Sequence, residues 1–142
     1  MADWLYGKGR EAFANGLIAW GSGTGGDDIR AMLVDSTDYS TAEANKDVHD
    51  FKDDVASGGI VSTSGAFTGK SYTLGVCDAD DVTFSAVSGD SCEYVIIYKH
   101  TGVDGTARLI AKIDSYNGLA ITPNGGDIRL AWPGDANKIF KL

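Results

Sequence analysis

The chain has 142 residues, 43% of them hydrophobic and 23% charged, which is typical of one globular domain and not of a disordered segment. Its formal net charge is −8 and no two of its 12 Lys and Arg residues adjoin, which argues against binding to nucleic acid or to an anionic membrane. No apolar run approaches the ~18 residues of a membrane helix, and the first residues lack the pattern of a signal peptide.

The first 16 residues are predicted to form a helical arm. In the range 5–16, Leu5 and Phe13 share one face, and Gly16 is a suitable end for a helix. A short apolar run at 17–20, a glycine-rich loop at 21–27 and a strand at 29–34 follow. The range 40–54 is the other helical candidate, with Thr41 as its N-cap and apolar residues at helical spacing.

After Gly58 the sequence is typical of short strands separated by turns. The range 94–98 is apolar on both faces and predicts a central strand, whereas 109–113 alternates with Lys112 and predicts a half-exposed strand. The turn at 123–126 predicts a hairpin between 119–122 and 128–132. Further strands are expected at 60–63, 67–74, 82–86 and 139–140.

This order of elements predicts a single, mainly β domain spanning residues 1–142. Residues 1–16 would form the N-terminal helix or arm, and residues 17–142 an antiparallel β-sandwich or jelly-roll-like barrel with one further short helix.

Candidate catalytic and metal motifs lack the context that their chemistry requires. The glycines at 21–26 match G-x-G-x-x-G, but two aspartates and a strand follow them where a phosphate site needs a helix. The aspartates at 78, 80, 81 and 90 lack the spacing of a calcium loop, which favours solvated turn carboxylates over the alternative of a weakly bound cation. His49 and His100 have no metal-ligand spacing, and Ser91 has no local base. We therefore expect no enzyme, no cofactor and no metal site.

Cys77 and Cys92 leave two alternatives open. Cysteines of a cytosolic protein are usually reduced and partly buried. Both residues nevertheless adjoin polar turns at strand edges, where a disulfide within or between subunits would form if the strands pair suitably.

Aromatic residues provide the remaining candidates for contact. Trp20 and Trp132 lie in apolar patterns and are predicted core residues. Trp4 and Tyr6 are candidate interface anchors, because aromatic side chains bury a large area at low entropic cost. In the glycine loop, Gly23 and Gly25 are candidates for contact with a neighbouring subunit.

Six segments of the sequence carry a likeness to known proteins: WLYGKGREAF (4–13), IRAMLVD (29–35), ADDVTF (79–84), VIIYKHTG (95–102), ITPNGGDI (121–128) and ANKIFKL (136–142). Through them the chain resembles, over nearly its whole length, a family of small virion structural proteins of tailed bacteriophages. It departs from that pattern in its enlarged glycine loop at 21–26 and in its cysteines at 77 and 92.

The resemblance implies a protein that is made in the host cytoplasm and is carried on the virion. The favoured function is a capsid decoration or cement protein on the outer surface of the capsid. Its partners would be the major capsid protein and further copies of itself, with a trimer favoured by analogy. A tail, baseplate or fibre-adaptor component is the alternative, and a carbohydrate-binding module is a more remote one.

Overall fold

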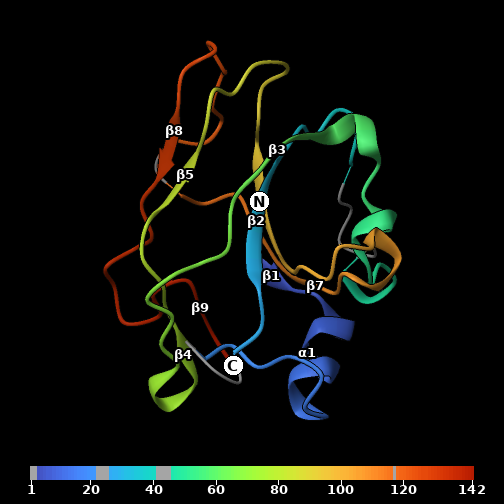
Figure 1. The fold of residues 1–142 in the computed structure, drawn as a ribbon, viewed down its shortest axis with the longest axis vertical. Helices are drawn as coiled ribbons and strands as arrows, with labels where there is room; N and C mark the ends of the chain where they lie inside the picture. Colours follow the sequence, from blue (N-terminus) through green and yellow to red (C-terminus); the bar gives the residue numbers. More distant parts are fainter. Residues whose placement is uncertain (1–2, 22–25, 41–45, 117) are drawn as a thin grey trace.

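We describe residues 3–21, 26–40, 46–116 and 118–142 of a computed structural model of the chain. It is mainly β, with antiparallel sheets and one α-helix, α1 (Gly7–Ala14) (Figure 1). The main sheet has five strands in the order β1-β7-β6-β2-β3. Their bounds are β1 (Trp4–Leu5), β2 (Ile29–Val34), β3 (Ile60–Thr63), β6 (Tyr94–Lys99) and β7 (Leu109–Ile113).

Two smaller sheets complete the β structure. Strand β4 (Val76–Cys77) pairs with β9 (Phe140–Lys141), and β5 (Val82–Phe84) pairs with β8 (Ile128–Leu130). In the part of the chain that the structure describes, no sheet closes into a barrel. Short 3-10 turns lie at Lys52–Asp54, Ser57–Gly59, Thr73–Gly75 and Asp104–Thr106. None of the described helices is long and apolar enough to cross a membrane.

The central strands β2 and β6 bury side chains on both faces of the main sheet. Successive residues of a strand point to opposite faces, and here both sets are apolar. Leu33 and Ile97 join one buried cluster, and Met32 and Ile96 join the other. The prediction of a central strand covered on both sides is therefore confirmed for β6.

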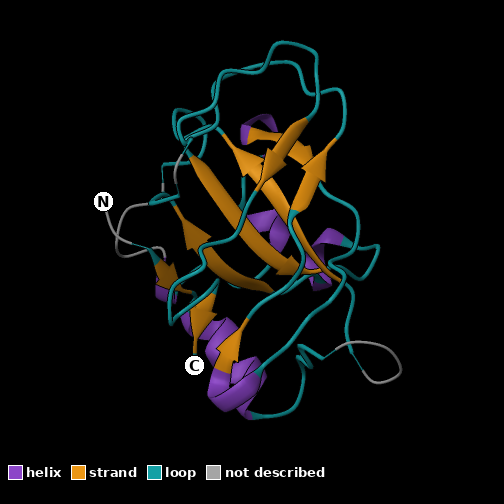
Figure 2. Ribbon diagram, turned by 90° about the vertical axis from the view of Figure 1, so that its left-hand side faces the viewer, coloured by secondary structure: helices purple, strands orange, loops and turns teal. Residues whose placement is uncertain are grey.

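The larger cluster is closed by the two small sheets and by α1, which lies at the lower end of the molecule near the C-terminus (Figure 2). Trp20 and Trp132 belong to this cluster, as the sequence predicted. Helix α1 approaches β7 so closely that a Cβ at Gly9 would meet the Leu109 carbonyl oxygen at 2.5 Å. The missing side chain of Gly9 therefore allows the helix to pack against β7.

Both predicted helices differ from the observed ones. Helix α1 begins at Gly7 and not at residue 5, because Trp4 and Leu5 pair with β7. In the described residues 46–54, the helical structure is limited to short 3-10 turns. Backbone bonds from Lys52 to Ala107 and from Leu109 to Asp50 hold that segment against the start of β7. The predicted N-cap, Thr41, lies outside the described residues.

Three strand predictions are also wrong in part. Strand β8 pairs with β5, whereas Ile121 bridges to Cys92, so the expected hairpin between 119–122 and 128–132 does not form. The range 67–74 forms no strand and ends in a 3-10 turn. Strand β7 is buried at every residue, including Lys112, which was expected to face solvent.

Candidate functional site

A hollow of about 320 Å³ lies between the edge strand β1 and the C-terminal strand β9. The Asp3 carboxylate fixes the start of β1 by accepting hydrogen bonds from the backbone N–H groups of Asp114 (2.9 Å) and Ser115 (3.2 Å). On the far side, pairing of β9 with β4 places the C-terminal segment. The lining includes Trp4, Leu5, Ile113, Asn137, Ile139 and Phe140, and so is largely apolar.

Trp4 is half-buried and lines this hollow, so it retains the role of candidate interface residue. Its ring also covers the Lys112 ammonium, with Nζ 4.2 Å from the Trp4 ring centroid and 4.3 Å from that of Tyr94. Lys112 is 0% exposed and donates to the Asp114 carboxylate at 3.3 Å. Two aromatic rings and one carboxylate therefore hold a buried cation under β1.

Tyr6 is fully buried, so it does not serve as a surface anchor in the folded protein. Its backbone N–H donates to Ile110, which continues the β1 pairing and turns the side chain to the same face as Trp4. The Tyr6 hydroxyl lies 3.4 Å from that of Tyr39, which lies 2.6 Å from His49 Nδ1. Burial raises the pKa of both tyrosines.

Cys77 and Cys92 are free thiols, and both are fully buried in the larger cluster. Burial raises the pKa of Cys77 to about 12. Burial, followed by the charges of Glu93, Asp35 and Asp90, raises the pKa of Cys92 to about 11. Both residues are thus buried thiols in this structure, and a bond to another subunit would first require opening the core. The interface candidates Gly23 and Gly25 lie outside the described residues.

The aspartates that the sequence singled out are not gathered around one point. Asp81 pairs with Arg129 at 2.7 Å, and Asp80 accepts a hydrogen bond from the Thr68 hydroxyl at 2.9 Å. Asp90 instead lies with two residues from the turn after β2. One carboxylate oxygen from each of Asp35, Asp38 and Asp90 lies within 4.8 Å of the others. This group joins distant parts of the chain, so residue spacing carried no signal for it.

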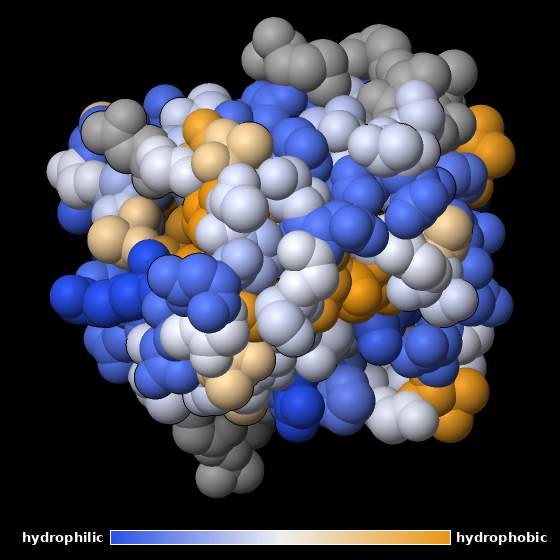
Figure 3. All heavy atoms as spheres, turned by 90° about the horizontal axis from the view of Figure 1, so that it is seen from above, coloured by the Kyte–Doolittle hydropathy of each residue, from blue (hydrophilic) through white to orange (hydrophobic). Residues whose placement is uncertain are grey.

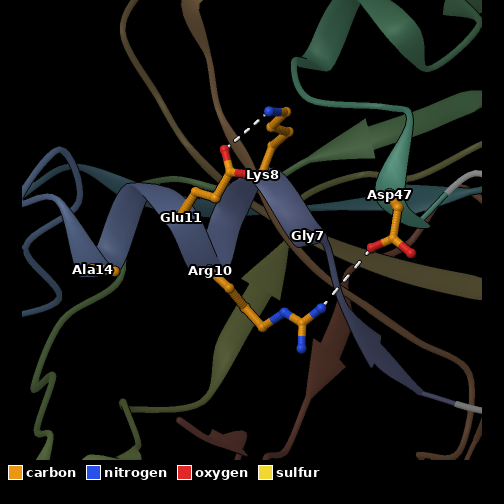
Figure 4. Close-up of a pocket in the computed structure, with 6 residues that line it drawn as sticks. All are labelled: Gly7, Lys8, Arg10, Glu11, Ala14 and Asp47. Carbon is orange, nitrogen blue, oxygen red and sulfur yellow. Dashed lines mark hydrogen bonds and ion pairs between the residues drawn. The ribbon is translucent and has the colours of Figure 1, made fainter.

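A second hollow, of about 530 Å³, lies beside α1 and is lined by side chains of both positive and negative charge (Figure 4). Lys8 pairs with Glu11 at 2.9 Å, and Arg10 pairs with Asp47 at 3.9 Å. A hydrogen bond from Lys46 lowers the pKa of the Asp47 carboxyl. Because each cation that lines the hollow already has a carboxylate partner, the hollow offers no surplus positive charge for an anion.

The other candidate catalytic side chains have structural contacts. The Ser91 hydroxyl lies 3.2 Å from the Thr122 hydroxyl, and neither histidine is its partner in the described contacts. His49 belongs to the buried tyrosine chain, and the ring of His100 packs against Tyr98.

No protein-family model matches the chain, and no curated protein matches it. The hollow between β1 and β9 combines a largely apolar lining with a place at the edge of the main sheet.

Proposed function

We propose that the protein is a non-enzymatic structural component of a tailed-phage virion, and that it decorates the outer surface of the capsid. One observation carries the proposal. The two terminal segments of the resemblance, residues 4–13 and 136–142, meet in space and line the same hollow. Segments that are far apart in the chain and converge on one apolar hollow are suited to binding a partner.

The hollow has the size and lining of an anchor pocket. At about 320 Å³ it falls at the lower end of the range of small binding sites, and it suits one large side chain of a neighbouring subunit. Interfaces draw most of their binding energy from a few such buried anchors. Leu5, Ile139 and Phe140 would contact the apolar part of that side chain, and Asn137 lies at an exposed part of the lining.

We further infer that the two small sheets act together as the second layer of a β-sandwich. They cover the face of the main sheet that carries the larger cluster, while β1 remains at the edge of that sheet. The hollow would then lie at the open edge between the layers. A homo-oligomer, with a trimer favoured by analogy, would present several such hollows to the capsid surface.

The proposal is tested by the copy number of the chain in purified particles, measured by quantitative mass spectrometry against the major capsid protein. Decoration predicts hundreds of copies per particle that co-purify with empty heads. Copies in the single digits or low tens would identify a tail or baseplate component instead. Absence of the chain from purified particles would overturn the virion assignment.

A pair of variants tests the hollow itself. Asn137→Trp should fill it and reduce incorporation into particles by roughly tenfold or more, since a central anchor contributes about 2 kcal/mol. The neighbouring Ala136→Trp is the matched control, because Ala136 is exposed but does not line the hollow. Equal incorporation of the two variants would remove the hollow from the interface.

A further inference from the structure

We propose that a second groove, at the end of strand β2 and the start of β6, binds an extended basic segment of the partner through its arginine or lysine side chains. The inference deepens the proposed function and rests on it only for the identity of the partner. The groove has a volume of about 420 Å³. Its lining includes Ser36, Glu93, Tyr94, Asp114, Ser115 and Leu119.

Backbone and side-chain contacts fix the walls of this groove. The Glu93 carboxylate accepts a hydrogen bond from the Ser36 backbone N–H at 3.2 Å, which joins the turn after β2 to the start of β6. The opposite wall, Asp114 and Ser115, is fixed by the Asp3 carboxylate. The groove is therefore formed before any partner binds.

Negative charge continues beyond the groove. Asp35, on the same turn as Ser36, lies with Asp38 and Asp90, with oxygens within 4.8 Å of one another. Asp35, Asp90 and Glu93 all act on the thiol of Cys92, so they lie within electrostatic range of one point. The turn after β2 lies in the upper half of Figure 1, and the face seen from above in Figure 3 is mostly hydrophilic, with several apolar patches between the hydrophilic residues.

These carboxylates have no positive partner among the described residues. Asp28 and Asp81 make ion pairs, but Asp35, Asp38, Asp90 and Glu93 make none. Asp35 has the strongest need for a positive partner, because it is only 6% exposed and its Oδ1 accepts one hydrogen bond, from the Thr37 N–H. A buried carboxylate without a cation is costly, so this position favours a positive charge supplied from outside.

Tyr94 gives the groove a feature that a single cationic side chain can bind, in addition to its general negative charge. Its ring lies 4.3 Å from the Lys112 ammonium, and the same residue lines the groove. An arriving guanidinium would meet an aromatic ring and carboxylates together, as Lys112 does inside the protein. Arginine is the best fit, because its planar group stacks on a ring and bonds carboxylates in pairs.

Charge complementarity selects the occupant. The chain carries a net charge of −8, and carboxylates that are unpaired among the described residues lie around the groove, so a basic segment would be attracted to it from a distance. A divalent cation on Asp35, Asp38 and Asp90 is the competing outcome of the test.

The test measures binding of a fluorescein-labelled Ala-Arg-Ala-Arg-Ala-Arg-Ala peptide to the full chain by anisotropy at low salt. We expect saturable binding and much weaker binding of the peptide with glutamine in place of arginine. The triple variant Asp38→Asn/Asp90→Asn/Glu93→Gln should weaken binding of the arginine peptide by roughly tenfold, because it removes three negative charges beside the groove. Chemical-shift changes should map to Ser36, Tyr94 and Ser115.

The matched control is Glu11→Gln/Asp47→Asn/Asp53→Asn, which removes the same charge from exposed positions elsewhere. This control should weaken binding of the arginine peptide by less than about twofold, through the change in net charge alone. If both triple variants weaken peptide binding equally, or if no saturable binding is found, the proposed binding of a basic segment is wrong. If calcium blocks peptide binding and this effect requires Asp38 and Asp90, the carboxylates form a cation site instead. These results are independent of the copy number in particles, so the two proposals can fail separately.

Discussion

The two faces of the main sheet are buried in different ways. The face with Leu33 and Ile97 packs against the two small sheets, and its aromatic residues form a chain of ring contacts. Its indole N–H groups donate to backbone carbonyls, as Trp20 does to Asp78 at 3.0 Å and Trp132 to Asp80 at 2.9 Å. The opposite face, with Met32 and Ile96, buries Tyr6, Tyr39 and Tyr98, with Lys112 beneath Trp4.

The difference shows how each face resists change. A face closed by sheets excludes water through shape, so loss of volume is its main weakness. The other face is closed by turns and keeps polar groups inside, so its weakness is a polar group that loses its partner. The following predictions separate these two modes.

The largest effect is expected from loss of volume on the first face. Phe84 is fully buried in β5, and Phe84→Ala should lower the free energy of unfolding by about 3–5 kcal/mol. Urea denaturation measures the loss. Thr83→Ala, on the exposed side of the same strand, should stay within about 0.5 kcal/mol. Comparable losses in the two variants would contradict the assignment of the buried face.

Removal of a buried charge tests the second face. Lys112→Met should lower stability by roughly 3 kcal/mol, because it leaves the Asp114 carboxylate, whose side chain is 9% exposed, without its cation. Adding Asp114→Asn should recover more than half of that loss. A single variant as stable as the native chain would show that the ion pair contributes nothing net.

High pH should affect both faces, beginning with the thiols of the first. The pKa values of Cys77 and Cys92 are raised from an ordinary value near 9 to about 12 and about 11, so folding favours the neutral thiols. Their contribution is complete below pH 9 and is lost as the pH rises toward 11, because the unfolded chain ionises first. Between pH 8 and 10 the loss should be on the order of 2 kcal/mol.

Urea midpoints across this pH range measure the slope, and the Cys77→Ala/Cys92→Ala variant should flatten it. A thiol-reactive dye should likewise find no reactive cysteine in the native protein at pH 8 and two after denaturation. Rapid reaction of either thiol before denaturation would contradict their burial.

A smaller effect is expected from Tyr39→Phe, which removes the hydroxyl between Tyr6 and His49. The change should cost about 1–2 kcal/mol, since the Tyr6 hydroxyl is left buried without a partner. Tyr6→Phe/Tyr39→Phe should cost less than Tyr39→Phe alone, as measured by thermal unfolding. Tyr72→Phe is the control, because Tyr72 is largely exposed.

The elements that sequence predicted best are those in which local pattern and burial agree. The apolar runs of β2 and β6 need no distant partner to be recognised, and α1 was missed only at its ends. The failed hairpin shows the limit. The residues at 123–126 do include a bend, but their backbone hydrogen bonds are made with Val87, and β8 pairs with β5. Both pairings depend on tertiary structure and not on the local sequence.

The candidate site was predictable only in part, for the same reason. Trp4 could be named as a candidate contact residue from its type and place, whereas the hollow beside it needs Ile139 and Phe140 from the other end of the chain. The alternation around Lys112 indicates a solvent-facing residue until Trp4 and Tyr94 are seen to cover it. Likewise, no local signal joins Asp35 to Asp90.

The pairing of Trp4 with Lys112 also sets the order in which the domain can assemble. Strands β6 and β7 are near neighbours in sequence and pair directly, so they can form early, as local contacts do. Strand β1 has no partner until β7 has left the ribosome, and closing so long a loop is entropically unfavourable. The N-terminal segment should therefore join the sheet late in synthesis. Until then the aromatic side chain that covers Lys112 is available to chaperones.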